Sequence, residues 1–437
     1  MVCQLENLRG CLPSSIRSIL EELPDGLDET YERILKKIRK PNQGHAHRLL
    51  QCLVAAARPL RVEELAELLA FDFDEEKIPE LNLEWRWEDQ EEAVLSTCSR
   101  LVVIVKNEES RIVQFSHFSV KEFLTADRLA EPVRDVSRYH IQLDAAHTVL
   151  ARACLGVLLQ LGDGVDQDGM KKFPLARYSA QYWTTHAQFQ DVSSHIKDGM
   201  ERLFDADKPH FATWLWIYND DQDGRSMSTA RPEKPEAVPL YYAASFGFRD
   251  LAEHFIAKHP EHAIAKGGKA VTVMHVAARE GYADILSLLL GHGADLDGRG
   301  SWGQTPLQRA AWTGKVDAGK FLLDHGANIN AQNDDKSTAL FMAAIQGHVE
   351  FVRMLLKRGA AIDIRNVTGS SPLHWAAQGG EIQVVQLLLD NGADVHARNT
   401  FDETPYQSVL GPKRQEIRNL LFIYGAECLE NPFDVES

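Results

Sequence analysis

Paired cysteines, long apolar runs and an excess of positive charge are all missing from this sequence of 437 residues. Its six cysteines are widely spaced and never form a C-x-x-C pair, which argues against a zinc ribbon or a disulfide framework. The longest apolar stretch, residues 149–161, is too short to span a bilayer, and residues 1–20 lack the apolar core of a signal peptide. We therefore expect a cytoplasmic protein with reduced thiols.

The charge balance excludes further classes of protein. The sequence has 47 basic and 63 acidic residues, and its net charge of -16 opposes nonspecific attraction to phosphate backbones and to anionic membranes. We accordingly expect neither a nucleic-acid partner nor a membrane partner. The hydrophobic fraction of 44% is typical of a globular protein, and the length corresponds to two or three domains of ~150 residues.

The sequence motifs of several common catalytic chemistries are absent. The sequence contains no G-x-S-x-G, no H-E-x-x-H and no Cys-His nucleophile signature. It also lacks G-x-x-x-x-G-K-[ST], the loop that cradles phosphates and supplies a lysine and a magnesium-binding hydroxyl. We therefore expect no ATP hydrolysis, no catalytic residue, no cofactor and no metal site.

One pattern recurs at a fixed interval through the C-terminal half. Six tripeptides of the Thr-Pro-Leu type, the last four spaced by 33 residues, begin at Val238, Thr272, Thr305, Thr338, Ser371 and Thr404. A Gly-Ala step recurs at the same interval, with its glycines at Gly293, Gly326, Gly359, Gly392 and Gly425. Two markers that keep one register through consecutive copies predict an array of stacked repeats.

Each marker has a mechanical interpretation. Thr or Ser caps the start of a helix, and proline at the next position has its φ preset. The alanine pairs that follow, such as 310–311, let neighbouring helices approach closely, and Gly314 ends this helix with tolerance for positive φ. Apolar runs such as 321–323 then form a second helix, which the Gly of Gly-Ala closes. The repeat is predicted to be helix, turn, helix and loop.

The patterns T-P-L-x-x-A-A-x-x-G and L-L-x-x-G-A at this period resemble ankyrin repeats. We count six repeats over residues 238–430. The first is degenerate, because residues 259–262 stand where Gly-Ala is expected. The last has Val409 and Leu410 in place of the alanines, followed by Pro412, as expected of capping repeats whose outer face meets water.

The N-terminal part is predicted to contain a winged helix. Helical spacing of apolar residues and a β-rich hairpin give helices at 28–40, 46–57, 62–71 and 91–100, and strands at 101–105 and 111–115. Residues 24–31 and 115–124 resemble the part that follows the NTPase in fungal NACHT-type proteins. These are NLR-like STAND signalling receptors, many of which end in ankyrin repeats. Whether an NTPase lies upstream in a longer protein or the chain stands alone is open.

We therefore expect a mostly α fold, with a winged-helix and helical N-terminal region followed by an ankyrin-repeat α-solenoid. The predicted parts are the end of a NACHT-associated helical region (1–40), a winged-helix-like domain (41–135), a helical domain (136–218), a linker (219–237) and six ankyrin repeats (238–430). The helical domain should have an aromatic core made of Tyr178, Tyr182, Trp183, Phe211, Trp214 and Trp216.

Four local motifs are interpreted as structural. Residues 298–303 match G-x-G-x-x-G but lie between repeats, where they resemble an ankyrin finger loop rather than a dinucleotide site. Residues 219–224 resemble half a calcium loop without its final Glu. His254, His259 and His262 suggest zinc, but no cysteine or suitably spaced carboxylate completes the set. His117 is interpreted as a packed structural histidine near what the resemblance implies is a nucleotide-sensing surface.

The leading functional hypothesis is a non-enzymatic protein-interaction module, in which the solenoid is the partner-binding sensor of an NLR-like signalling protein. The resemblance implies that partner contacts come from the finger residues before each Thr-Pro-Leu position and from the pair after the alanines. These are Ser301, Trp302, Trp312, Thr313, Asp334, Asp335, Ile345, Gln346, Val367, Thr368, Gln378, Thr400 and Phe401. We expect Trp302, Trp312 and Phe401 to be the main anchors, although Trp312 could instead pack between repeats.

Two other functions are considered. A winged helix can bind DNA, but its recognition helix, residues 88–100, carries Glu88, Asp89, Glu91 and Glu92 and would repel phosphates. The chain could also be part of a nucleotide-switched STAND receptor whose NTPase lies upstream. The identity of the protein partner is not encoded in any motif of the sequence.

Overall fold

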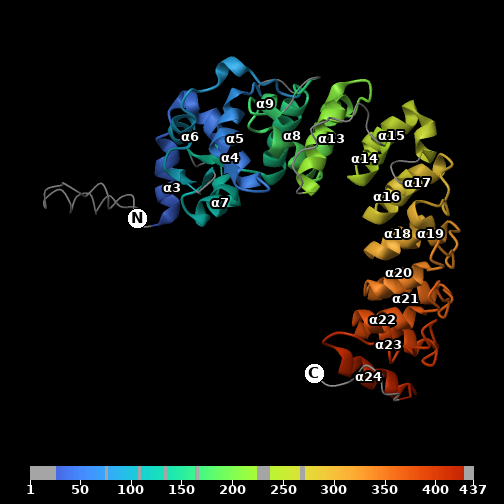
Figure 1. The fold of residues 1–437 in the computed structure, drawn as a ribbon. Helices are drawn as coiled ribbons and strands as arrows, with labels where there is room; N and C mark the ends of the chain where they lie inside the picture. Colours follow the sequence, from blue (N-terminus) through green and yellow to red (C-terminus); the bar gives the residue numbers. More distant parts are fainter. Residues whose placement is uncertain are drawn as a thin grey trace. The chain divides into compact units, whose positions relative to one another are not determined.

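The computed structural model describes residues 26–427 apart from short gaps at 74–76, 107–109, 132–134, 163–164, 166, 224–236 and 266–270. The chain separates into two units, Met1–Glu233 and Lys234–Ser437, and each is described by itself (Figure 1). Helices dominate both units, which confirms the predicted fold class. No helix in the described ranges combines the length and apolar character needed to cross a membrane.

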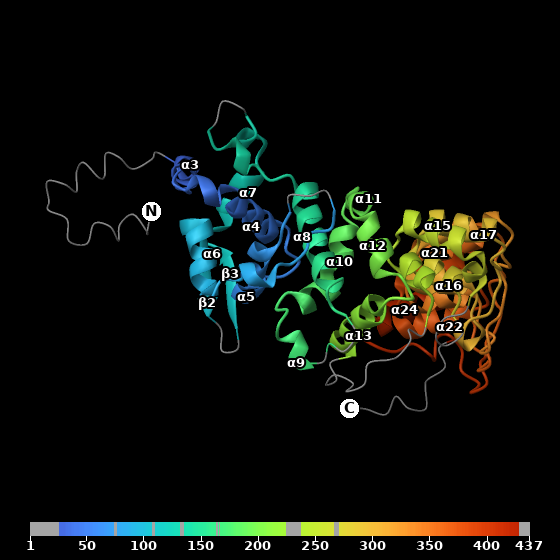
Figure 2. The same cartoon turned by 90° about the horizontal axis from the view of Figure 1, so that it is seen from above.

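The described part of the first unit begins with the winged helix, and most of the predicted NACHT-associated region (1–40) lies outside the described residues. Its elements are α3 (Leu27–Lys36), η1 (Lys40–Asn42), α4 (Gln43–Ala55), β1 (Leu60–Arg61), α5 (Val62–Glu67), η2 (Leu68–Ala70), η3 (Leu83–Trp85), α6 (Gln90–Cys98), η4 (Ser99–Leu101), β2 (Val102–Lys106), β3 (Arg111–Phe115), α7 (Phe118–Thr125), η5 (Asp127–Leu129) and η6 (Ser137–Tyr139). The strands form an antiparallel sheet of order β1-β3-β2, which lies beside α5 and α6 (Figure 2). Leu50 of α4, Leu65 of α5 and Val94 of α6 are buried.

Three details of the winged helix differ from the sequence prediction. The first helix ends at Lys36 rather than at residue 40, and the second begins at Gln43 rather than at residue 46, with Gly44 in its first turn. The first turn tolerates glycine because its N–H groups have no partner within the helix. Leu60 and Arg61 add a third strand to the predicted hairpin. Two residues are too few for alternation to be visible in a sequence.

A helical segment completes the first unit. It consists of α8 (Leu143–Leu158), α9 (Gln167–Met170), α10 (Ala176–Ala187), α11 (Val192–His195), α12 (Lys197–Leu203) and α13 (Pro209–Asp223). Five of the six aromatic side chains predicted to form the core are buried, while Tyr182 is partly exposed. The rings of Trp183 and Trp214 meet edge to face at 5.5 Å. The helix α13 continues through Asp223, so the first five residues of the predicted linker and calcium-like loop are helical; the rest of the linker to residue 236 lies outside the described residues.

The second unit is a stack of helix pairs. They are α14 (Pro239–Ser245) with α15 (Arg249–Lys258), followed by the turn η7 (Pro260–Ile264), then α16 (Val273–Glu280) with α17 (Ala283–Gly291), α18 (Pro306–Thr313) with α19 (Val316–Asp324), α20 (Ala339–Ile345) with α21 (Val349–Lys357), and α22 (Pro372–Gly379) with α23 (Ile382–Asp390), and finally α24 (Arg414–Ile423). A turn, η9 (Ser301–Gly303), lies before α18. The first helices of successive pairs contact one another, as do the second helices (Figure 1). Buried Leu307, Leu340 and Leu373 lie between the layers.

The predicted start and stop signals of the repeats are confirmed where whole helices form. Thr305 is the N-cap of α18: its hydroxyl accepts a hydrogen bond from the Gln308 backbone N–H at 3.4 Å, and its own N–H donates to Gln308 Oε1 at 2.8 Å. The Thr338 hydroxyl likewise accepts from the Phe341 N–H at the start of α20. Gly314 ends α18 with a φ of 71°.

The prediction that Thr404 opens an equivalent helix is wrong. Gln407 Oε1 accepts a hydrogen bond from the Thr404 N–H at 3.0 Å, as Gln308 does at Thr305, but the chain forms only a turn before α24. Val409 and Leu410 replace the small alanines, and Gly411 has a φ of 80°. Pro412 has no N–H to continue a helix and disfavours helical backbone at the residue before it. The sixth repeat therefore retains only its second helix.

Candidate protein-interaction surface

A tight hairpin loop precedes the capping Thr or Ser of each of the last four repeats. Each loop closes through a backbone hydrogen bond over four residues, from Gly300 N to Gln304 O (2.9 Å), Asn333 N to Ser337 O (3.0 Å), Asn366 N to Ser370 O (3.1 Å) and Asn399 N to Glu403 O (3.0 Å). The segment 298–303, which matched a dinucleotide motif, is the first of these loops and follows a loop rather than a strand. Its glycines serve the turn, since Gly303 has a φ of 62°.

Neighbouring loop tips are joined to one another by backbone hydrogen bonds. The Asp334 N–H donates to Trp302 O at 3.0 Å, and the Val367 N–H donates to Asp335 O at 2.9 Å. The Thr400 N–H donates to Thr368 O at 2.9 Å. We call residues 301–302, 334–335, 367–368 and 400–401 the finger row, because these bonds hold the four tips in one continuous line.

Side chains of the first helices contact backbone carbonyls of the loops that carry the finger row. The His275 ring Nε2 lies 2.8 Å from Gln304 O, Gln308 Nε2 donates to Ser337 O at 2.8 Å, and the His374 ring Nε2 lies 3.0 Å from Glu403 O. Each contact links a helix to the loop of the following repeat. Burial lowers the pKa of both histidines, so each ring is neutral at pH 7 and donates Nε2–H to the carbonyl. Three of the four loops are therefore held by neutral hydrogen bonds that are buried or part-buried.

The finger row exposes most of the residues predicted for it. Trp302 is 72% exposed, Phe401 73% and Val367 52%, while Asp334, Asp335 and Thr400 also face solvent. Ser301 and Thr368 are half-buried. The Thr368 hydroxyl is used within its own loop, where it donates to Asn366 Oδ1 at 2.7 Å. Two exposed aromatic rings thus stand at the two ends of a row with two carboxylates between them.

The residues predicted at the ends of the first helices have mixed surroundings. Trp312 is 42% exposed, so it does not pack fully between repeats, and Gln346 and Gln378 are exposed. Ile345 and Thr313 are half-buried. The Thr313 hydroxyl donates to Arg279 O of the preceding repeat at 2.7 Å, which gives this side chain a structural contact.

Two side chains on the same helix face were not among the predicted residues. Arg309 and Trp375 occupy the fourth position after the capping residue, one turn before the predicted helix-end positions, and both are partly exposed. The Trp375 ring lies 5.7 Å from that of Phe341, and its indole N–H has no hydrogen-bond partner within the described residues. Residues three apart share a helix face. The spacing of three from Trp312 back to Arg309 could therefore have identified Arg309 in the sequence as a residue of the same surface.

The described cysteines and His117 show no nucleophilic arrangement. Cys52, Cys98 and Cys154 are unpaired and buried, and burial raises the pKa of Cys98 and of Cys154 to about 12, which keeps both as thiols. His117 is exposed rather than packed, which corrects the prediction of burial. It is the N-cap of α7, where its Nδ1 accepts a hydrogen bond from the Ser119 N–H at 3.3 Å.

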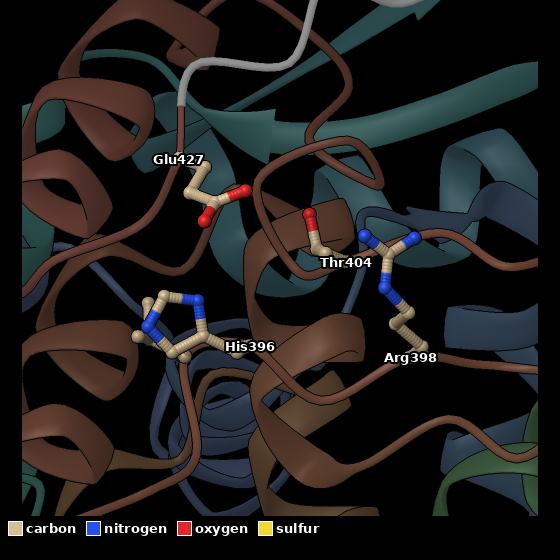
Figure 3. Close-up of a pocket in the computed structure, with 5 residues that line it drawn as sticks. His396, Arg398, Thr404 and Glu427 are labelled. Carbon is tan, nitrogen blue, oxygen red and sulfur yellow. The ribbon is translucent and has the colours of Figure 1, made fainter.

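A small pocket lies at the C-terminal end of the described repeats. It has a volume of about 350 Å³ and is lined by Val395, His396, Arg398, Thr404 and Glu427. Figure 3 shows His396, Arg398 and Glu427 on different sides of this opening. Arg398 is already engaged, since it pairs with Asp402 Oδ2 at 3.0 Å. Because Arg398 is already paired and the other lining residues differ in charge, the pocket favours no single class of ligand.

Comparisons with known proteins agree with this architecture. The family model described as ankyrin repeats (3 copies) matches residues 240–333 and 325–399, and that of the GPI inositol-deacylase winged helix domain matches residues 31–133. Ankyrin repeats form an interaction fold that has no catalytic chemistry of its own. In this chain they follow a winged-helix domain in the sequence.

Two fungal proteins are similar to parts of the chain. "Azaphilone pigments biosynthesis cluster protein L" of Monascus ruber is 32% identical over 294 residues, which cover 63% of this chain and 61% of that protein. "Vegetative incompatibility protein HET-E-1" of Podospora anserina is 24% identical over 261 residues, covering 54% of this chain and 18% of that protein. The chain thus spans less than two thirds of either relative. The predicted resemblance to fungal NACHT-type proteins is confirmed for part of the chain.

Proposed function

We propose that this ankyrin-repeat chain captures a protein partner along the finger row and the adjoining first helices, as the recognition part of an NLR-like signalling protein. The observation that carries the proposal is the combination of a rigid row with large exposed aromatic side chains. Trp302, Trp312 and Phe401 are the anchors, since aromatic residues dominate the binding energy of protein interfaces. The similarity to a vegetative incompatibility protein supports a signalling context.

The finger row also favours a particular kind of partner. Trp302 and Phe401 lie three repeats apart, and neighbouring helices pack about 8–10 Å apart, so the two rings are separated by roughly 24–30 Å. An extended peptide covers this distance with about eight residues. Asp334 and Asp335 stand between the rings, which favours a partner segment with a basic centre and apolar ends.

A displayed library of twelve-residue peptides tests the proposal although the natural partner is unidentified. Peptides are selected on the wild-type chain, and their affinity is measured on the Trp302→Ala, Trp312→Ala double variant. We expect a loss of at least ~30-fold, which corresponds to ~2 kcal/mol for a pair of interface anchors. Circular dichroism should show unchanged helicity.

The control is Trp85→Ala, which removes a tryptophan of the first unit that is 51% exposed. This variant should bind the selected peptides as the wild type does. Equal affinity of the double variant and the wild type for every selected peptide would remove Trp302 and Trp312 from the site.

The nucleotide-dependent part of such a receptor would have to come from residues other than those of this sequence. The sequence contains no phosphate-binding loop of the Walker type. We propose that the chain supplies recognition, and that any NTPase acts from an upstream segment in a longer protein. Reading the genomic frame ahead of Met1 tests this point, because a G-x-x-x-x-G-K-[ST] motif there would identify the NTPase.

The alternative of DNA binding is not favoured by the winged helix. Glu88, Asp89 and Glu92 lie at the start of α6, where Glu88 and Asp89 are exposed, and Glu91 pairs with Arg111 Nη1 at 2.6 Å. An acidic helix end repels a phosphate backbone. A salt-dependent gel shift with duplex DNA would overturn this preference.

A further inference from the structure

The connection after α15 in the first repeat brings together two imidazoles and a carboxylate. His259 is the C-cap of α15, and Glu261 and His262 lie on the turn η7. One ligand atom from each of the three residues can be chosen so that all of them lie within 4.8 Å of one another. The sequence argument against zinc found no suitably spaced carboxylate, but the turn places Glu261 beside both histidines.

The backbone of η7 holds these three residues in a compact turn. The His262 N–H donates to His259 O at 3.0 Å, and the Ala265 N–H donates to His262 O at 3.1 Å. Pro260 fixes its own φ between the first two ligands. Ala263 is completely buried and anchors the turn against the repeat. The ligands therefore project from an anchored segment.

The three side chains lie close together and reach solvent. The rings of His259 and His262 stack with centroids 4.8 Å apart, and His259 Nδ1 lies 3.3 Å from Glu261 Oε1. The side chains of His259 and Glu261 are 53% and 66% exposed, so an ion can enter from solvent.

We propose that His259, Glu261 and His262 bind a divalent transition-metal ion such as Zn²⁺, with solvent completing its coordination. Metal–nitrogen and metal–oxygen distances of about 2.0–2.2 Å place two ligands of one ion at most ~4.4 Å apart. Small side-chain rotations on the solvent side bring the three ligand atoms into this range. Two imidazoles with one carboxylate select Zn²⁺, Cu²⁺, Ni²⁺ or Co²⁺ over Mg²⁺ and Ca²⁺.

Metal binding at this place would reinforce a degenerate repeat. Residues 259–262 replace the Gly-Ala step that ends the second helix of the other repeats. An ion held by His259 at the end of α15 and by two residues of η7 would fasten the helix to the turn. Because the ion binds the folded repeat, it should raise the melting temperature of the chain.

Calorimetric titration of the full chain with Zn²⁺ alone tests the proposal. We expect one ion to bind, and we expect His262→Ala and Glu261→Gln each to weaken binding at least ~10-fold. The matched control is His292→Ala, because His292 is the C-cap of α17, one repeat after His259, and lies outside the cluster. This variant should bind Zn²⁺ as the wild type does. Far-ultraviolet circular dichroism verifies that each variant is folded.

A Co²⁺ titration gives an independent readout. The visible absorption of bound Co²⁺ should disappear in the His259→Ala, His262→Ala double variant. The proposal is overturned if the wild-type chain takes up no Zn²⁺ at a concentration of ~1 mM, if Mg²⁺ competes at equal concentration, or if the double variant binds Zn²⁺ with unchanged affinity. The last outcome would place the bound ion elsewhere in the chain.

Discussion

Trp302 combines two properties that rarely occur in one residue. Its φ of 60° lies in the left-handed region, and its side chain is 72% exposed. A side chain in this region costs ~1–2 kcal/mol compared with glycine, because Cβ approaches the following carbonyl. The Asp334 N–H, which donates to Trp302 O, holds the strained tip in place. A strained backbone beneath an exposed ring is a pattern of binding sites.

Replacing this tryptophan with glycine should separate stability from binding. We expect Trp302→Gly to leave the free energy of unfolding unchanged or to raise it by up to ~1 kcal/mol, because relief of strain offsets the extra freedom of the unfolded chain. The same change at helical Trp312 should lower it by ~1 kcal/mol or more. Urea denaturation measures both. A large loss of stability in Trp302→Gly alone would contradict the strained conformation.

The carboxylates between the aromatic rings should control the charge preference of the site. We expect Asp334→Lys with Asp335→Lys to weaken the selected basic peptides at least ~10-fold at low salt, since like charges now face one another. The difference should shrink as salt rises, because exposed charges are screened. Fluorescence anisotropy at two salt concentrations measures it. An unchanged affinity at low salt would show that the acidic centre takes no part in binding.

The buried leucines of the repeats should dominate stability. Leu307 and Leu340 are almost completely inaccessible, whereas Leu410 in the turn of the last repeat is 55% exposed. Truncating either buried leucine to alanine should cost ~2–5 kcal/mol through lost contacts and a residual cavity. Leu410→Ala should cost less than ~1 kcal/mol. Equal melting temperatures for all three variants would contradict the packing of Leu307 and Leu340 between the layers.

At the scale of the helix, one capping pattern has two different outcomes. The Thr-Pro sequence at Thr305 opens the two-turn helix α18, while the same sequence at Thr404 opens a single turn. In both places a glutamine three residues later accepts a hydrogen bond from the threonine N–H. The cap is local, but continuation of the helix depends on alanines at the fifth and sixth positions and on the residue at the eighth. Pro412 occupies the eighth position in the last repeat.

This difference predicts unequal costs for the same substitution. Thr305→Ala should lower the free energy of unfolding by ~1 kcal/mol, the usual value of a helix N-cap. We expect Thr404→Ala to cost clearly less, because no helix begins there. Guanidinium denaturation of both variants beside the wild type measures the two values. Equal losses would show that the turn at Thr404 contributes as much as a helix.

At the scale of the whole molecule, buried histidines couple stability to pH. In the first unit, the Ala57 N–H donates to the Tyr178 hydroxyl at 3.1 Å, and this hydroxyl lies 2.9 Å from Nε2 of His186. The Nδ1 of His186 lies 2.9 Å from Nδ1 of His147. Burial, followed by the charge of His147, lowers the pKa of His186 to about 3. Burial also lowers the pKa of His47, His275 and His374, so both units contain histidines that stay neutral.

Stability should therefore fall as pH falls below 6.5. The unfolded chain takes up protons at histidine near pH 6.5, while these folded histidines take them up only at lower pH, so unfolding becomes easier as the pH decreases. We expect His186, whose pKa in the folded chain is about 3, to contribute a loss of roughly 1 kcal/mol between pH 6.5 and 5.5. Glu67, whose pKa is raised by burial, acts in the opposite direction. Urea denaturation at several pH values measures the slope.

Comparison of one variant with the wild type assigns this pH dependence. His186→Gln removes a buried histidine whose pKa is lowered in the folded chain and should flatten the slope. A stability that stays constant or rises from pH 7.5 to 5.5 would contradict the role of these histidines.

Much of the candidate site could be predicted from the sequence because its signals are local. The capping residues, the alanine pairs and the glycines with positive φ act within one or two turns of chain, and their period revealed the register of the repeats. The register, together with the resemblance to ankyrin repeats, placed Trp302, Val367 and Phe401 on loop tips. Arg309 and Trp375 were missed because partial exposure on a helix face depends on how closely the next layer packs.

The sequence alone determined that repeated two-helix units follow a winged helix, since each unit carries its own start and stop signals. Only the tertiary structure decided which polar groups of neighbouring repeats meet. The hydrogen bond from Asp334 to Trp302 and the contact of His374 with Glu403 join residues about 30 positions apart. The approach of Glu261 to His259 and His262 depends on a turn that replaces the expected Gly-Ala step. Such contacts are set by stacking and by chain reversal, neither of which leaves a periodic signal in the residues involved.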